Sequence, residues 1–174
     1  MKWTSVVGAT LLVTPLVSHA TTYLTTEQAK QVIFPHQTLI QHNIQLTKDQ
    51  EKKLKELSGI TYPLKTDQIF KTKEGDWLII DQVLGKHEMI TYAVGIKANG
   101  SIKQIEIMEY TETYGAQVRN ASWRDQFVGK TSNSAITLGK DIQNISGATL
   151  SSKHITDGVH RIMGLYAMEL KSLK

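Results

Sequence analysis

The sequence predicts an α+β domain, in which an antiparallel sheet of hairpins is flanked by N-terminal helices and by one C-terminal helix. Three observations lead to this class. The β-type segments in the middle of the chain are consecutive and joined by short turn sequences, which favours hairpins. Two earlier segments begin with helix-capping sequences. The end of the chain repeats apolar residues at helical spacing.

Residues 1–20 have the organisation of a secretory signal peptide. Lys2 gives a positive start, residues 6–17 are mostly apolar, and Ser18-His19-Ala20 is a small-x-small cleavage sequence. The apolar run is shorter than the ~20 residues that a membrane-spanning helix needs. The sequence therefore predicts cleavage after Ala20 and export to the periplasm. Retention of this segment as an inner-membrane anchor is the alternative.

Residues 21–174 have a length typical of one domain. Loss of Lys2 with the signal leaves 19 basic and 16 acidic residues, a net charge of +3. The basic residues are scattered, so a nucleic-acid partner is not expected. The absence of cysteine excludes disulfide redox chemistry, iron–sulfur clusters and thiolate zinc sites. The six histidines lack the paired spacing of metal ligands, so no metal site is predicted, and any redox role requires a bound cofactor.

Two helices are expected in the N-terminal part, residues 21–60. Thr25-Thr26-Glu27-Gln28 has the form of a capping box and predicts a helix over residues 27–34, before a proline. Thr47-Lys48-Asp49-Gln50 repeats the pattern and predicts a second helix to Leu57, closed by Gly59. The buried side of the second helix is expected to carry Leu46, Leu54 and Leu57.

The middle of the chain predicts two hairpins. Residues 68–73 and 77–83 flank the loop 74–76, and residues 88–97 and 101–110 flank Ala98-Asn99-Gly100, where Asn-Gly is a strong hairpin signal. The last of these segments does not alternate strictly, since its apolar residues are Ile102, Ile105 and Ile107. A bulge or burial on both faces is therefore expected there.

After this sheet, residues 111–116 are expected to form a loop, and Asn120 to cap a short helix that places Trp123 and Phe127 in the core. Residues 136–142 have the composition of a short strand. A final helix is predicted over residues 152–171 from the spacing of Ile155, Val159, Ile162, Met163, Tyr166 and Leu170.

The turn before the last helix, residues 146–152, is rich in small and hydroxyl residues. A helix N-terminus has unpaired N–H groups and a positive dipole end, so such a turn suits a phosphate. The residues alone allow two interpretations: a phosphate site, or an ordinary serine-rich helix cap.

Ser146-Gly147-Ala148-Thr149, followed by Leu-Ser-Ser, resembles the flavinylation motif of the FMN-binding domain family. That family includes flavin subunits of the sodium-pumping NADH:quinone reductase and of the Rnf complex, and small exported proteins. A second match is Glu112-Thr113-Tyr114-Gly115, followed by Trp123 to Lys130, which is similar to the Glu-Thr-x-Gly loop and the Trp-x-x-Gln-Phe-x-Gly-Lys segment of the family. The resemblance covers about the last 80 residues.

The resemblance implies FMN as the cofactor, and a flavin transferase that esterifies the hydroxyl of Thr149 to the FMN phosphate. It makes residues 21–174 an FMN-binding domain whose flavin-binding part spans about residues 66–174. The cofactor-binding residues that it implies, besides Thr149, are Ser146, Gly147, Ala148, Leu150, Ser151, Lys153, Glu112, Thr113, Tyr114 and Gly115. His154 follows Lys153 and is either near the flavin or an exposed surface histidine.

As in the family, the protein is expected to relay electrons between membrane or periplasmic redox partners, as a carrier rather than a stand-alone catalyst with its own catalytic residues. One departure concerns Gln143, because the family usually has an acidic residue three positions before the motif serine. The alternative is therefore a binding module of the same fold that holds FMN non-covalently or not at all.

Overall fold

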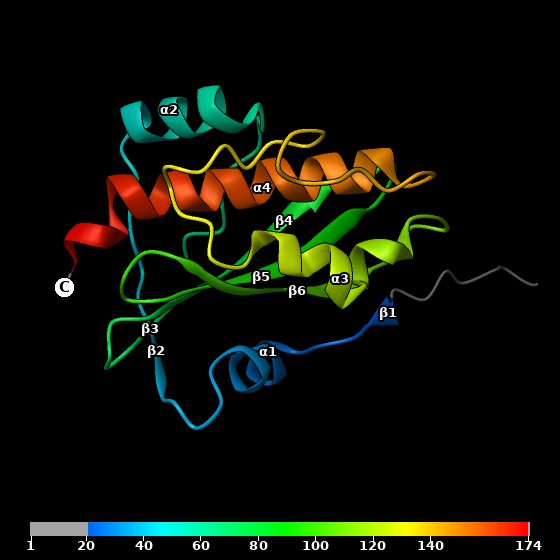
Figure 1. Ribbon diagram of the computed structural model, residues 1–174. Helices are drawn as coiled ribbons and strands as arrows, with labels where there is room; N and C mark the ends of the chain where they lie inside the picture. The colour runs from blue at the N-terminus through cyan, green and yellow to red at the C-terminus, as the bar shows by residue number, and fades with distance from the viewer. Residues whose placement is uncertain (1–20, 174) are drawn as a thin grey trace, which may run out of the picture.

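Six antiparallel strands in the order β1-β6-β5-β4-β3-β2 form one sheet in the computed structural model, which describes residues 21–173 (Figure 1). The signal-peptide prediction for residues 1–20 lies outside the described residues. The strands are β1 (Thr21–Thr22), β2 (Leu39–Gln41), β3 (Ile69–Thr72), β4 (Trp77–Leu84), β5 (Met89–Ile96) and β6 (Ile102–Tyr110). The α-helices are α1 (Thr26–Ile33), α2 (Lys48–Ser58), α3 (Ala121–Arg124) and α4 (Thr149–Met168). Short 3-10 turns are η1 (Ala116–Arg119), η2 (Asp125–Phe127) and η3 (Leu170–Ser172).

The predicted α+β class and both hairpins are confirmed. The β3–β4 and β5–β6 pairs are antiparallel, and Gly100 turns the second hairpin with a φ of 86°. Register shifts interrupt the β5–β6 ladder between Thr91 and Tyr92 and between Gly95 and Ile96. These bulges account for the irregular apolar spacing of β6, because each extra residue changes which face the following side chains occupy.

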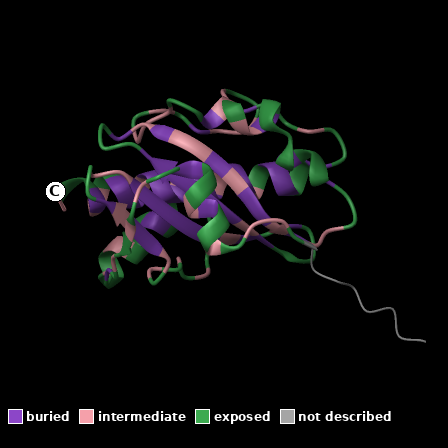
Figure 2. Ribbon diagram, turned by 90° about the horizontal axis from the view of Figure 1, so that it is seen from below, coloured by how far each residue is buried: buried purple, intermediate pink, exposed green. Residues whose placement is uncertain are grey.

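Helices cover both faces of the sheet (Figure 1). Among residues 21–173, α1 is the one α-helix on its face of the sheet, where Ile33 and Phe34 join a small core with Leu78, Ile80 and others. The close approach of α1 requires Gly95, since a Cβ there would lie 2.3 Å from Ile33 Cγ2. α4 and α3 lie on the other face, over the larger core, and α2 packs on the side of α4 that is turned away from the sheet. Figure 2 shows that the strands are largely buried, whereas exposed residues gather on the outer sides of helices and in the loops.

Both predicted N-terminal helices are confirmed together with their caps. Thr25 and Gln28 form a reciprocal capping box at α1, and Thr47 and Gln50 form another at α2. Gly59 ends α2 in the left-handed conformation. Leu54 is buried as expected. Leu57 is 42% exposed, which corrects its predicted place on the buried side of α2.

α4 is the central helix of the larger core. It begins at Thr149, three residues before the predicted start, because Ala148 already accepts the first helical hydrogen bond from Ser152 N. Arg161 lies almost fully buried within this helix, and its Nη2 contacts Asp81 Oδ2 of β4 at 2.5 Å. In the part of the chain that the structure describes, no helix is long and apolar enough to cross a membrane.

Two further predictions are wrong. Residues 136–142 form a tight turn with one isolated bridge, not a strand, because the Asp141 carboxylate accepts the N–H groups of Ile136 and Thr137 at 3.1 and 2.7 Å. Such side-chain hydrogen bonds compete with a β-ladder. The Asn120 side chain makes no cap hydrogen bond at α3. The short strands β1 and β2 have no counterpart among the predicted elements, since two or three residues carry no periodic signal.

Candidate functional site

Two sequence blocks that lie far apart in the chain meet at the N-terminus of α4. They line a groove of about 440 Å³, a volume within the range of small-molecule sites. The groove is lined by Lys86, His87, Glu112, Thr113, Tyr114, Gly147, Ala148, Thr149, Leu150 and Ser151. The structure thus brings together most of the site residues predicted from sequence and adds two that no sequence motif indicates, Lys86 and His87. Ser146, Gly115 and Lys153 lie outside this lining.

The N-terminus of α4 has no side-chain cap. Ala148 is the N-cap residue, and the first turn contains no acidic residue, in contrast to the capping boxes of α1 and α2. Gly147, with a φ of 80°, turns the chain into the helix. The interpretation of this turn as an ordinary serine cap is therefore wrong, and the first N–H groups of α4 remain available to an anion.

The hydroxyl groups of the turn have different environments. Ser151 is buried, and its Oγ shares a hydrogen bond of 3.0 Å with Tyr110 Oη. Ser152 is buried as well and donates to Ala148 O at 2.7 Å. Thr149 is exposed at the first helical position, and its Oγ1 accepts a hydrogen bond of 3.2 Å from Asn144 Nδ2. The Thr149 hydroxyl group is thus accessible from solvent, whereas the Ser151 hydroxyl group is buried and hydrogen-bonded within the protein.

Gly115 lies where the loop after β6 touches α4. Its φ is 99°, and an added Cβ would lie 2.4 Å from Tyr110 Oη and 3.1 Å from Ala148 Cβ. Tyr110 Oη also donates to Tyr114 O, which fixes the same loop. Gly115 therefore allows the loop to pack closely against α4, but it is not among the residues that line the groove.

We expect Gly115→Ala to destabilise the protein more than Gly129→Ala. Both glycines have a positive φ, but nothing lies within 4 Å of a Cβ at Gly129, which makes it a matched control for backbone strain. The crowding at Gly115 should add about 1–3 kcal/mol to the loss in free energy of unfolding. Urea unfolding of both variants measures the difference, and equal losses would show that the close approach is unimportant.

Glu112 holds the loop between β4 and β5. Its Oε1 accepts the N–H groups of His87 at 2.6 Å and of Glu88 at 3.1 Å. Burial alone would raise the pKa of this carboxyl, but the backbone N–H groups of residues 86–88 outweigh it and lower the pKa. A Cβ at Gly85 would lie only 2.5 Å from Oε1, so this close fit also requires a glycine. The Glu112 carboxylate thus positions one wall of the groove.

The other end of this loop is held from α4. His154 Nδ1 donates to the carbonyl oxygens of Leu84 and Gly85, the latter at 3.2 Å. His154 is half-buried and occupied by this contact. Lys86 and His87 cannot be assigned to the site from sequence because they belong to a different hairpin from either motif, and no spacing signal links them to the turn before α4.

The acid sensitivity of folding should depend on Glu112. Because its pKa in the folded protein is lower than the ordinary value of 4.5, its contribution to stability is present above that pH and is lost as the pH falls through the folded pKa. We expect wild type to exceed Glu112→Gln in free energy of unfolding at pH 7, with the difference shrinking below about pH 4.5. Urea titrations between pH 7 and pH 3 measure this; a difference independent of pH would contradict it.

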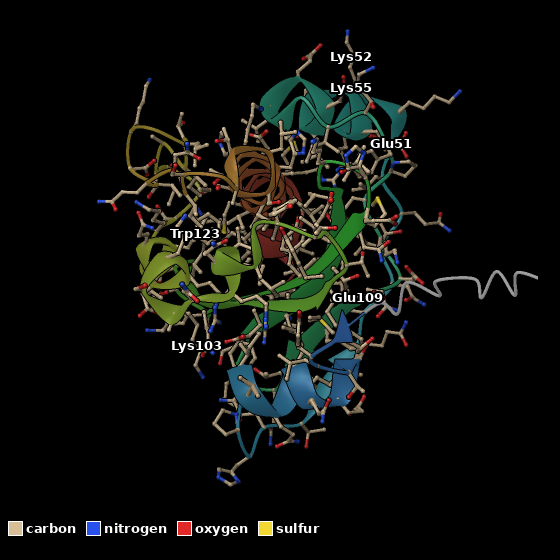
Figure 3. The ribbon with its side chains drawn as sticks, turned by 90° about the vertical axis from the view of Figure 1, so that its right-hand side faces the viewer. Glu51, Lys52, Lys55, Lys103, Glu109 and Trp123 are labelled. Atoms are coloured by element: carbon tan, nitrogen blue, oxygen red, sulfur yellow. The ribbon has the colours of Figure 1, made fainter. Side chains whose placement is uncertain are left out.

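The aromatic block around Trp123 holds the segment that leads to Thr149. Trp123 Nε1 donates to Gln143 O at 2.8 Å, and Gln126 Oε1 accepts Gln143 N at 2.8 Å. Trp123 and Phe127 are buried with their rings edge to face at 5.2 Å, which confirms their predicted place in the core. Figure 3 labels Trp123, on the α3 side of α4. These hydrogen bonds involve only the backbone of residue 143, so they do not require an acidic side chain at that position.

Residues 85–164 match the model of the FMN-binding domain family. The chain contains an FMN-binding domain. The matched segment begins at the loop held by Glu112 and ends within α4, so it includes both motif blocks. FMN is accordingly the cofactor of this domain. Among residues 21–173, no group of three or more histidine, aspartate or glutamate side chains is placed to hold a metal ion.

The FMN-binding domain is similar to part of a curated protein from Acetobacterium woodii, which is a subunit of the Na⁺-translocating ferredoxin:NAD⁺ oxidoreductase complex. The two sequences are 35% identical over 81 residues. The alignment covers 41% of this chain and 39% of that relative, so the chain spans well under half of the relative's length.

The residues of the groove fit FMN. The uncapped start of α4 supplies unpaired N–H groups for a phosphate, and no acidic side chain lies in its first turn to repel one. The apolar parts of Tyr114 and Leu150, 80% and 44% exposed, are available to a flat ring. When bound, FMN supplies the electron-accepting chemistry, while the protein supplies binding, orientation and electrostatics.

Proposed function

We propose that this protein is an exported electron-transfer flavoprotein that carries FMN covalently, through a phosphodiester at Thr149. The observation that supports this most directly is the position of the Thr149 hydroxyl group. It is exposed at the uncapped start of α4, in the same groove as Glu112, Thr113 and Tyr114. A phosphate linked there would lie beside the first N–H groups of the helix, where a negative charge is stabilised.

Neighbouring residues complete this arrangement. Asn144 Nδ2 donates a hydrogen bond to Thr149 Oγ1 and thereby helps to hold the hydroxyl group in place. Lys153 lies one turn further along α4, where it pairs with Asp157 at 2.6 Å. Its positive charge is therefore partly compensated, and we expect the helix N–H groups to dominate phosphate binding.

Maturation by a flavin transferase and electron exchange with a membrane or periplasmic redox partner belong to this proposal. The relative's name describes one subunit of a redox complex, which supports a role in electron transfer between proteins. A covalent tether suits an exported carrier because dilution cannot remove the cofactor.

A second candidate function is a binding module of the same fold that holds FMN non-covalently. Its support is Gln143, at a position that is usually acidic in flavinylated relatives. The backbone contacts of Gln143 to Trp123 and Gln126 leave its side chain exposed, where a transferase would meet it.

The intact mass of the protein from its native host separates the two candidates. Covalent attachment predicts a mass raised by one FMN less one water, with flavin absorbance that stays with the protein in denaturant. An unmodified mass with flavin released by denaturant would support the non-covalent module. An unmodified mass without flavin, from cells that possess a competent transferase, would contradict the covalent proposal.

A further inference from the structure

The loop of residues 85–88 presents two basic side chains from a fixed backbone. Glu112 accepts N–H groups at one end of the loop, and His154 donates to carbonyl oxygens at the other. Contacts from two separate elements therefore fix the backbone from which the side chains of Lys86 and His87 extend. Both residues are exposed, and both line the groove that Thr149 lines.

The groove is lined by one lysine, Lys86, one histidine, His87, and one acidic residue, Glu112. Glu112 is the one acid among the lining residues of the described part, and its carboxylate is occupied by backbone N–H groups. Lys86 forms no ion pair with any residue of the described part, whereas Lys153 is paired with Asp157. Lys86 therefore lines the groove without a salt-bridge partner among the described residues, whereas the Glu112 carboxylate is hydrogen-bonded to the backbone of the same loop.

We propose that Lys86 and His87 contact the bound cofactor and raise the reduction potential of its flavin ring, an inference that rests on the function proposed above. Reduction by two electrons with uptake of one proton, the electrons coming from an external donor, adds one negative charge to the ring. A positive charge beside the ring stabilises that product more than the neutral oxidised form.

The magnitude follows from the exposure of both side chains. Charge pairs at exposed sites contribute up to about 1 kcal/mol, which is about five-fold in an equilibrium constant. Removal of the Lys86 charge should therefore lower the equilibrium constant for reduction about five-fold, or by about 20 mV for a two-electron couple. The effect should shrink at high salt, because ions screen exposed charges.

The test is a spectroscopic redox titration of the flavin-loaded mature protein, produced with a flavin transferase and reduced stepwise by dithionite against indicator dyes. Lys86→Gln, His87→Gln and the double variant are compared with wild type at one pH. Lys73→Gln is the matched control, because Lys73 is exposed in the β3–β4 turn, at the opposite end of β4 from the loop of residues 85–88. Intact mass establishes that each sample carries flavin.

We expect Lys86→Gln to lower the potential, the double variant to lower it further, and Lys73→Gln to match wild type. Potentials of the three loop variants equal to that of Lys73→Gln, in samples that do carry flavin, would overturn the inference and leave the proposed function intact. Failure of wild type to carry flavin would instead count against the proposed function. Normal potentials with reduced flavin loading would assign the two residues to transferase recognition and also overturn the role in potential.

Discussion

Replacement of Thr149 by alanine is expected to abolish covalent FMN, whereas Thr149→Ser should retain it. Only a side-chain hydroxyl can form the phosphate ester, and the Thr149 hydroxyl is exposed at the first position of α4. Alanine is a good helix former, and Thr149 provides no cap, so the alanine variant should keep its fold. Intact mass after co-expression with a transferase measures the loss directly.

Ser146→Ala is the matched control for this experiment. Ser146 is the other exposed hydroxyl residue of the turn, only three positions away, and it lies outside the groove lining. We expect Ser146→Ala to remain able to carry covalent flavin, because it keeps the Thr149 hydroxyl group. Loss of flavin from Ser146→Ala together with full flavinylation of Thr149→Ala would show that the attachment residue has been assigned wrongly.

The largest effect on stability is expected from Asp81→Asn or Arg161→Met as single changes. Asp81 of β4 and Arg161 of α4 form an ion pair, and their side chains are 1% and 2% exposed. Tyr92 Oη donates to the same carboxylate at 3.1 Å, and Arg161 Nη1 donates to Tyr62 O at 3.0 Å. Removing one partner leaves an uncompensated buried charge, which typically costs about 3–5 kcal/mol. The free energy of unfolding in urea measures the loss.

A double variant, Asp81→Leu with Arg161→Met, measures how much the intact ion pair contributes to the free energy of unfolding. The single variants measure the loss when one charge is left without its partner. Well-packed apolar replacements of buried ion pairs are often neutral, so the double variant should be more stable than either single variant. Additive losses in the double variant would show that the two charges do not depend on each other.

Much of the fold follows from local sequence. The capping boxes at Thr25 and Thr47, the left-handed stop at Gly59 and the turn at Gly100 each depend on a few neighbouring residues, and the sequence predicts each of them. The prediction of a strand over residues 136–142 failed for a related reason. The Asp141 side chain captures two backbone N–H groups, a local competitor that apolar periodicity does not reveal.

The candidate site divides in the same way. The sequence by itself determined the α+β class, because caps and hairpin turns depend on adjacent residues. The resemblance of its two motif blocks to the FMN-binding domain family made Thr149 the expected attachment residue. Only the tertiary structure decided that Thr149 is exposed while Ser151 is buried, and that Lys86 and His87 belong to the groove. Those outcomes depend on contacts such as His87 to Glu112 and His154 to Leu84, which join residues 25 and 70 positions apart. No local pattern encodes such contacts, because they form only when the strands assemble and α4 packs against the sheet.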